Sequence, residues 1–359
     1  MTYAELSTAR RWLLFALVIT AGILNLVDRQ IIAVLKPVIS KDLGWTDNDY
    51  GTLAAWFQGG AAVAFLFTGW IADKLGVKWA NPLGVAAWSI AAMLHGWAQS
   101  TVQFVMVRVA LGATEAMGTP VGIKSIAAIL PPALRSSGYG AMNAANSIGA
   151  ILAPLAIPLV ALSFGWRATF VAAGMVGILW AGIWLVATRG LSLGAPARTA
   201  PAAAASAAAT PDRYGPILTE RRTWAIAVAK VLSDATWWLM LFWLPDFFNR
   251  EFGLSGVALG VPLAIAYSGA AAGSLLGGGI STQEKVGRVT AFGAFSGNIG
   301  GLVIAKVAGL VLSAGLGYLP LFGFAAISYL LAIGWIQLLV PVIRTVDGPP
   351  GAREIVPAH

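Results

Sequence analysis

The chain has 359 residues, of which 58% are apolar and only 11% are charged, and its mean hydropathy is +0.78. Ordinary soluble domains carry about 25% charged residues, so the composition excludes a soluble protein and indicates an integral membrane protein. The net charge of +8 would suggest nucleic acid as a partner of a soluble protein, but here the basic residues gather in alternate loops. There is no cysteine, and His95 and His359 are the only histidines, so no metal site or other cofactor is expected.

Apolar stretches long enough to cross a bilayer recur along the whole chain and predict an all-α membrane fold. The first stretch follows Arg10 and Arg11, but it runs beyond the length of a signal peptide and has no small-residue cleavage pattern, so it is predicted to be a span. The ten predicted spans are residues 13–35, 50–71, 79–99, 102–124, 137–162, 167–188, 223–247, 257–280, 290–314 and 317–342.

Basic residues are shared unequally between the two sides of these spans. With the N-terminus in the cytoplasm, the cytoplasmic loops hold most of them, and only Lys36, Lys41, Arg167 and Arg250 fall in the outer loops. Because cytoplasmic loops of membrane proteins are rich in Lys and Arg, this bias predicts an inner (plasma) membrane protein with both termini in the cytoplasm.

The spans fall into two groups of unequal size. Residues 190–221 are rich in Ala, Pro and Ser and are predicted to form a cytoplasmic linker. The linker separates a six-helix bundle at 1–189 from a four-helix bundle at 222–344, and a cytoplasmic tail follows at 345–359. Transporters are commonly built from two related halves, so the second half is two spans shorter than this plan predicts.

The loop after the second span reads G-W-I-A-D-K-L-G-V-K, from Gly69 to Lys78. Gly69 allows close helix approach, Asp73 can cap or pair at a helix end, and the lysines suit a cytoplasmic face. Taken alone, the segment could be a simple polar turn. The pattern resembles the signature loop of the major facilitator superfamily, and Gly69, Asp73, Lys74, Gly76 and Lys78 match its defining positions. The resemblance implies that these five residues form a gating loop.

Charged residues inside two spans are the strongest functional signal in the sequence. Arg108 and Glu115 are seven residues apart, about two helical turns, so both lie on one helix face with Gly112 between them. The first span carries Asp28 and Arg29. Charges in lipid are costly and indicate a water-filled pathway with a binding site and a proton switch. Two alternatives stay open: the charges of the fourth span could form a structural ion pair between helices, and Arg29 could extend to the membrane surface with Asp28 following it.

The sequence N-L-V-D-R of the first span, R-x(6)-E of the fourth and W-L-P of the seventh resemble the anion:cation symporter family of this superfamily, and its hexuronate transporters in particular. The resemblance covers nearly the whole chain. It implies a proton-coupled secondary transporter, not an enzyme, which carries a sugar acid such as glucuronate, galacturonate or a related aldonate by alternating access. It also implies that Asp28 and Glu115 take part in proton coupling, and that Arg29 and Arg108 bind the substrate carboxylate.

Three further side chains resemble substrate-facing positions of that family, namely Asn146, Trp238 and Asn298. Each has a structural alternative, because amides form hydrogen bonds between membrane helices and Trp is common at membrane interfaces. Lys230 and Asp234 in the seventh span are four residues apart and could simply pair with each other.

The chain departs from the family between the eighth predicted span and the next one. The family has two more helices here, its ninth and tenth, whereas this chain continues directly with T-Q-E-K-V-G-R, which places a junction near Thr282 to Glu284. In the superfamily the tenth helix lines the cavity and helps to gate it. The alternative function is therefore a transport-inactive, shortened member of the family. The expected partners are a sugar acid, protons and lipid, and the chain is expected to be a monomer that binds no nucleic acid.

Overall fold

The computed structural model describes residues 6–191, 193, 221–278 and 287–340, and it places their side chains except at 222 and 270–292. Every regular element in this part of the chain is a helix. In chain order the elements are α1 (Thr8–Val34), α2 (Lys36–Leu43), α3 (Asp47–Leu94), α4 (Thr101–Glu115), α5 (Gly118–Ile129), α6 (Pro132–Ala187), α9 (Arg221–Phe252), the 3-10 helix η2 (Gly256–Leu259), α10 (Gly260–Gly278), α11 (Gly287–Ser313) and α12 (Leu319–Leu339).

Two of these helices each contain two predicted spans. α3 and α6 are 48 and 56 residues long, whereas one crossing needs about 20. They bend at Gly76 (φ 67°) and Gly165 (φ 82°), in a backbone conformation that glycine adopts without strain. Six of the described helices are long and apolar enough to cross a membrane. α3 and α6 each provide two crossings, which raises the six helices to eight crossings. α4 together with α5 gives one more and α10 another, so the total equals the ten predicted spans.

The predicted linker at 190–221 lies almost entirely outside the described residues. The tail at 345–359 and the junction at 282–284 also lie outside them, so these three assignments stay predictions. We refer to α1–α6 as the first half and to α9–α12 as the second half. We also call the end of the molecule at which α1 begins the near end, and the end at which α1 finishes the far end.

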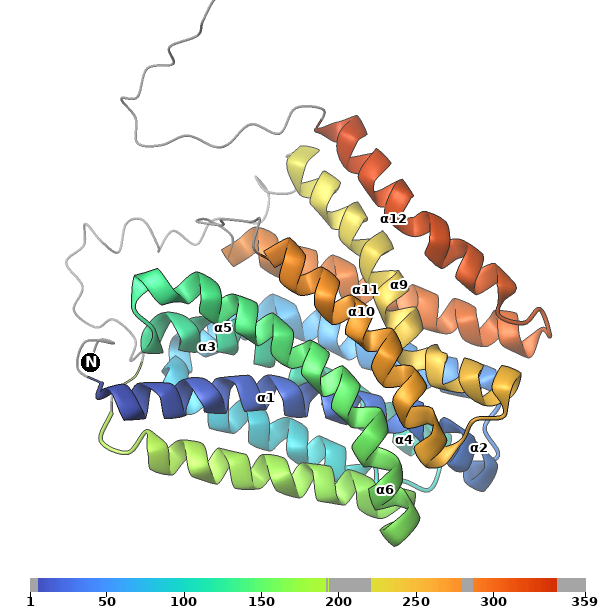
Figure 1. Ribbon diagram of the computed structural model, residues 1–359, viewed down its shortest axis with the longest axis horizontal. Helices are drawn as coiled ribbons and strands as arrows, with labels where there is room; N and C mark the ends of the chain where they lie inside the picture. Colours follow the sequence, from blue (N-terminus) through green and yellow to red (C-terminus); the bar gives the residue numbers. More distant parts are fainter. Residues whose placement is uncertain (1–5, 192, 194–220, 279–286, 341–359) are drawn as a thin grey trace, which may run out of the picture.

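The two halves meet toward the far end. Figure 1 shows the last turns of α9 and the start of α10 beside α2 and α6, whereas the first turns of α9 and the last turns of α12 diverge from α1. α11 packs along α3, and α10 packs along α6. The hydrogen bonds and ion pairs that join the two halves in the described residues involve the far portions of these helices.

Four charged side chains from both halves form a network at the far end. The ammonium group of Lys36 lies 2.9 Å from a carboxylate oxygen of Asp47 and 2.7 Å from one of Asp246. Arg250 pairs with the same two carboxylates. The hydroxyl of Tyr318 donates to Asp246 over 2.5 Å. We call Lys36, Asp47, Asp246 and Arg250 the far-end latch, because they tie α2 and α3 to α9.

Further polar contacts between the halves lie just inside the latch. The hydroxyl of Tyr50 donates to the carbonyl of Phe242 over 2.7 Å. On α11, the ammonium group of Lys306 donates to Asn48 at 2.6 Å and to Thr52 at 2.8 Å. The far end of the molecule is therefore closed.

Small residues bring α4 against α3 at the level of the predicted charges. A β-carbon added to Gly112 would lie 2.0 Å from the carbonyl oxygen of Phe57, and one added to Gly60 would lie 2.5 Å from that of Val109. Only glycine permits this approach. It holds Arg108 of α4 beside the aromatic ring of Phe57, with 5.1 Å between the guanidinium carbon and the ring centre.

Candidate functional site

The four charges predicted inside the spans come together at the centre of the first half, where α1 meets α4. The Nε atom of Arg29 lies 2.6 Å from a carboxylate oxygen of Glu115, so these two residues form an ion pair. Asp28, Arg108 and Glu115 are buried, and the side chain of Arg29 is 14% exposed. The second structural alternative does not fit, because Arg29 turns into the protein. The first is present in part: the Arg29–Glu115 ion pair joins two helices, whereas Arg108 has no hydrogen-bond partner among the described residues.

Arg108 is the unusual member of this cluster. It is fully buried, and its three guanidinium nitrogens have no hydrogen-bond partner among the described residues. The guanidinium group lies 5.1 Å from the ring centre of Phe57, and one oxygen of Glu115 is also without a partner. A buried cation without hydrogen bonds is costly, and burial of an accompanying anion would lower that cost. The cluster therefore contains a buried guanidinium group whose hydrogen-bond donors are unused within the described residues.

Aromatic rings from both halves enclose the cluster. The guanidinium carbon of Arg29 lies 5.4 Å from the ring centres of both Phe57 and Trp238. Trp238 stacks on Phe242, with 5.6 Å between ring centres. Such positions over an aromatic face stabilise a guanidinium group. Trp238, the aromatic residue predicted to face substrate, therefore lies at the charge cluster. Because Trp238 belongs to α9, the second half also contacts the cluster.

Gln58 belongs to the same region and was not predicted. It is fully buried, and both atoms of its amide lack partners among the described residues. A β-carbon on Gly301 of α11 would lie 2.3 Å from its amide nitrogen and 2.5 Å from Trp238. An amide inside an apolar span is the sequence signal that could have identified it.

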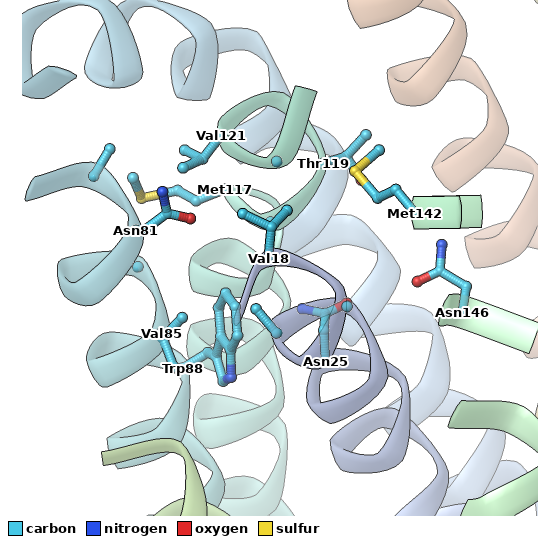
Figure 2. A pocket seen from close by; sticks show the side chains of 16 residues that line it. Val18, Asn25, Asn81, Val85, Trp88, Met117, Thr119, Val121, Met142 and Asn146 are labelled. Carbon is cyan, nitrogen blue, oxygen red and sulfur yellow. The ribbon is translucent and has the colours of Figure 1, made fainter. Parts of the chain in front are cut away.

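An open cavity lies on the near side of the cluster, between α1, α3, α5 and α6. Its empty volume is about 540 Å³ with the mouth included. Its polar lining includes Asn25, Asn81, Trp88, Thr119 and Asn146. In Figure 2 the labelled side chains of α3 lie on the left and those of α6 on the right, with Val18 and Asn25 of α1 between them. Asn146, predicted to face substrate, therefore lines this cavity.

The remaining predicted positions make local contacts. The amide of Asn298 donates to the carbonyl of Ala294 in its own helix over 2.8 Å, and Asn298 is not among the cavity-lining residues. Lys230 and Asp234 pair with each other at 2.7 Å, which is the structural alternative foreseen for them.

The predicted gating loop lies at the near end. Lys124 of α5 pairs with Asp73 at 2.5 Å and donates to the carbonyl of Gly69 at 3.0 Å. Lys74 lies 4.0 Å from the ring centre of Trp70. The contacts of Lys124 join α3 to α5 within the first half, and the bend at Gly76 comes three residues after Asp73. The backbone carbonyl of Lys78 accepts a hydrogen bond from the indole N–H of Trp184 over 3.1 Å.

A family profile described as Major Facilitator Superfamily matches residues 18–341. The chain belongs to the Major Facilitator Superfamily. The predicted membrane fold and superfamily are thereby confirmed. Within the described residues of this superfamily member, no group of three His, Cys, Asp or Glu side chains could hold a metal ion.

Curated members of the superfamily resemble the chain at low identity. The "Probable L-galactonate transporter" of Escherichia coli (strain K12) is 29% identical over 266 residues, which are 72% of this chain and 58% of that protein. The "Hexuronate transporter" of the same strain is 25% identical over 259 residues, 68% of this chain and 59% of that protein. The "Galacturonate transporter" of Dickeya chrysanthemi is 24% identical over 68% of this chain and 74% of that protein. The matched part of this chain thus spans about three fifths of the first two relatives, which are 58% and 59% covered.

A solved structure of the superfamily shares the fold. It is a bacterial homologue of the human lysosomal transporter Spinster, in an inward-facing and unoccupied conformation. The TM-score is 0.66 at 19% sequence identity, over 93% of this chain and 80% of that one.

Proposed function

We propose that this chain is a secondary active transporter that carries an anionic sugar acid, a hexuronate or an aldonate, together with protons. The names of the related transporters support the substrate class. The observation that carries the proposal is the fully buried guanidinium group of Arg108, which has no hydrogen-bond partner in the described part of the chain and lies beside the Arg29–Glu115 ion pair. A transporter of this kind acts by moving its substrate unchanged, so we propose no enzymatic step.

The charges of the cluster suggest how proton and anion are coupled. Asp28, Arg29, Arg108 and Glu115 sum to zero net charge when both carboxyl groups are ionised. When Glu115 takes up a proton, it releases Arg29 and leaves a net charge of +1, which matches one substrate carboxylate. The planar fork of an arginine holds a carboxylate through two parallel hydrogen bonds, so Arg29 and Arg108 can share the anion. Asp28, buried one residue from Arg29, is a second carboxyl group able to take the proton.

Alternating access requires that the two ends of the molecule open in turn. The far end is closed by the far-end latch, and the cavity lies on the near side of the charge cluster. The basic residues favour the near end as the cytoplasmic side of the inner membrane. We therefore assign this conformation to the stage at which a monomeric transporter exchanges substrate with the cytoplasm.

Replacing Glu115 with glutamine tests the coupling. In lipid vesicles with an inward proton gradient, the unaltered protein should accumulate labelled galacturonate, whereas the Glu115→Gln protein should not. The variant should still exchange internal for external galacturonate, because the amide keeps the shape of the side chain but cannot release a proton. Asp42→Asn, at a half-exposed carboxyl group of the far end, is the matched control and should accumulate normally. Gradient-driven accumulation by Glu115→Gln would contradict this role.

A transport-inactive, shortened member of the family is the second candidate. It is favoured by the length of the matched part, which is 58% and 59% of the first two relatives. Such a protein would be monodisperse and would bind galacturonate, yet it would neither accumulate nor exchange it. Exchange by the purified protein would rule this candidate out.

A further inference from the structure

At two places in the chain, residues that line the cavity lie one helical turn from residues of the charge cluster. Asn25 precedes Asp28 and Arg29 by one helical turn on α1, so the three side chains lie on one side of that helix. Gly118 follows Glu115 by three residues where α4 passes into α5, and a β-carbon on Gly118 would lie 3.5 Å from the amide nitrogen of Asn25. A molecule whose charged group reached the arginines would therefore have its remaining atoms at the cavity.

Two buried donors of the cavity have no acceptor. Asn25 is 9% exposed and Trp88 is 2% exposed, and neither the amide nitrogen of Asn25 nor the indole nitrogen of Trp88 has a partner in the described part of the chain. In contrast, the amide of Asn81 on the same wall donates to the carbonyl of Val77 at 3.0 Å and to the hydroxyl of Ser125 at 2.8 Å. Buried donors normally have partners, so these two call for an acceptor from outside the chain.

The rest of the wall suits a ligand with both polar and apolar faces. The indole ring of Trp88 and the side chains of Met117 and Met142 supply apolar surface, and Asn146 supplies an exposed amide. A carbon chain that carries hydroxyl groups has the same mixture: C–H groups that pack on an aromatic ring, and oxygens that accept hydrogen bonds.

We propose that this cavity holds the hydroxylated carbon chain of the sugar acid, with Asn25 and Trp88 donating hydrogen bonds to substrate hydroxyl oxygens. The inference rests on the proposed function, in which Arg29 and Arg108 hold the carboxylate. It adds that Asn25 and Trp88 select polyhydroxylated acids over simple carboxylic acids. Asn146 faces the same substrate atoms from α6.

The test compares two ligands on the purified full chain. Galacturonate carries hydroxyl groups, whereas hexanoate has the same number of carbons and a carboxylate but no hydroxyl group. The unaltered protein should bind galacturonate more tightly than hexanoate. Asn25→Ala and Trp88→Phe should each weaken galacturonate binding about 10-fold, the size expected for one lost hydrogen bond to a buried polar group, and leave hexanoate binding unchanged. Trp88→Phe keeps the aromatic ring, so it decides the matter if Asn25→Ala does not fold.

Trp184→Phe is the matched control. Trp184 is also fully buried, but it does not line the cavity and its indole N–H donates to the carbonyl of Lys78. This variant should bind both ligands as the unaltered protein does. Equal weakening of both ligands by Trp88→Phe, or no weakening of either, would overturn the inference while leaving the proposed function intact. An unaltered protein that binds neither galacturonate nor galactonate would overturn the proposed function itself.

Discussion

Replacing Arg108 with methionine is expected to abolish substrate binding and at the same time to make the substrate-free protein more resistant to heat. Two charge-assisted hydrogen bonds to the carboxylate would be lost, each worth about 1.5–3 kcal/mol, so the dissociation constant for galacturonate should rise about 100-fold or more. Arg108 is fully buried without hydrogen bonds in the described structure. A buried cation without hydrogen bonds carries a desolvation cost that methionine, of similar length, does not carry, so Tm should rise by a few degrees.

A structural role for Arg108 predicts the opposite pair of results. If the guanidinium group mainly held α4 in place, Arg108→Met would lower Tm, and any loss of binding would follow from misfolding. Arg167→Met is the control, since Arg167 is an exposed cation that pairs with Asp42 at 3.3 Å. That variant should leave both Tm and the dissociation constant near their original values. Normal galacturonate binding by Arg108→Met would contradict the assignment outright.

Replacing Lys36 with methionine is expected to open the far end. The side chains of Lys36 and Asp246 are 3% and 5% exposed, and Lys36 lies between the carboxylates of Asp47 and Asp246. Removal of one partner from a buried ion pair costs about 3–5 kcal/mol. Since the pair joins the two halves only while the far end is closed, the closed population should fall about 100-fold or more relative to the open one.

The opening can be measured by the distance between spin labels, and the absence of native cysteine makes labelling specific. Labels at Lys41→Cys and Glu251→Cys, both exposed at the far end, should move apart in the Lys36→Met protein. Labels at Ser136→Cys and Arg221→Cys, both exposed at the near end, should move closer together.

Arg167→Met again serves as the control for this experiment. It breaks an ion pair at the same end, but Asp42 and Arg167 both belong to the first half. Neither label distance should change in that variant. Unchanged distances in Lys36→Met would mean that the far-end latch does not hold the far end closed.

The charges of the site could be predicted from the sequence, whereas their pairing could not. Arg108 and Glu115 stand out because ionised groups are rare inside apolar spans. Their spacing places both on one helix face but identifies no partner for either. The structure pairs Glu115 with Arg29, because Gly112 lets α4 pack closely on α3 and α4 ends at Glu115 beside α1. Spacing within one helix carries no information on such contacts between helices.

Residues that act through neighbours distant in sequence were missed for the same reason. Lys36 and Arg250 looked like ordinary outer-loop cations. The ion pairs that join the two halves, Lys36 with Asp246 and Arg250 with Asp47, link residues that are about 200 positions apart in the sequence. Trp88 resembled a core residue of an apolar span, and only the structure leaves its indole nitrogen without an acceptor.

The number of crossings, in contrast, follows from hydropathy alone. The boundaries differ because the predicted loops within α3 and α6 are very short. At Gly76 and Gly165 the backbone leaves the helical conformation (φ 67° and 82°), so two helices meet directly at each of these residues.

Proton-coupled transport is tested most directly by counting the protons taken up when galacturonate binds. Titration calorimetry of the purified protein in buffers with different ionisation enthalpies gives this number. Because Glu115 is ion-paired with Arg29 before substrate arrives, we expect an uptake of about one proton per substrate at neutral pH, and none in Glu115→Gln. Tight binding of galacturonate with no proton uptake by the unaltered protein would rule out proton coupling through Glu115.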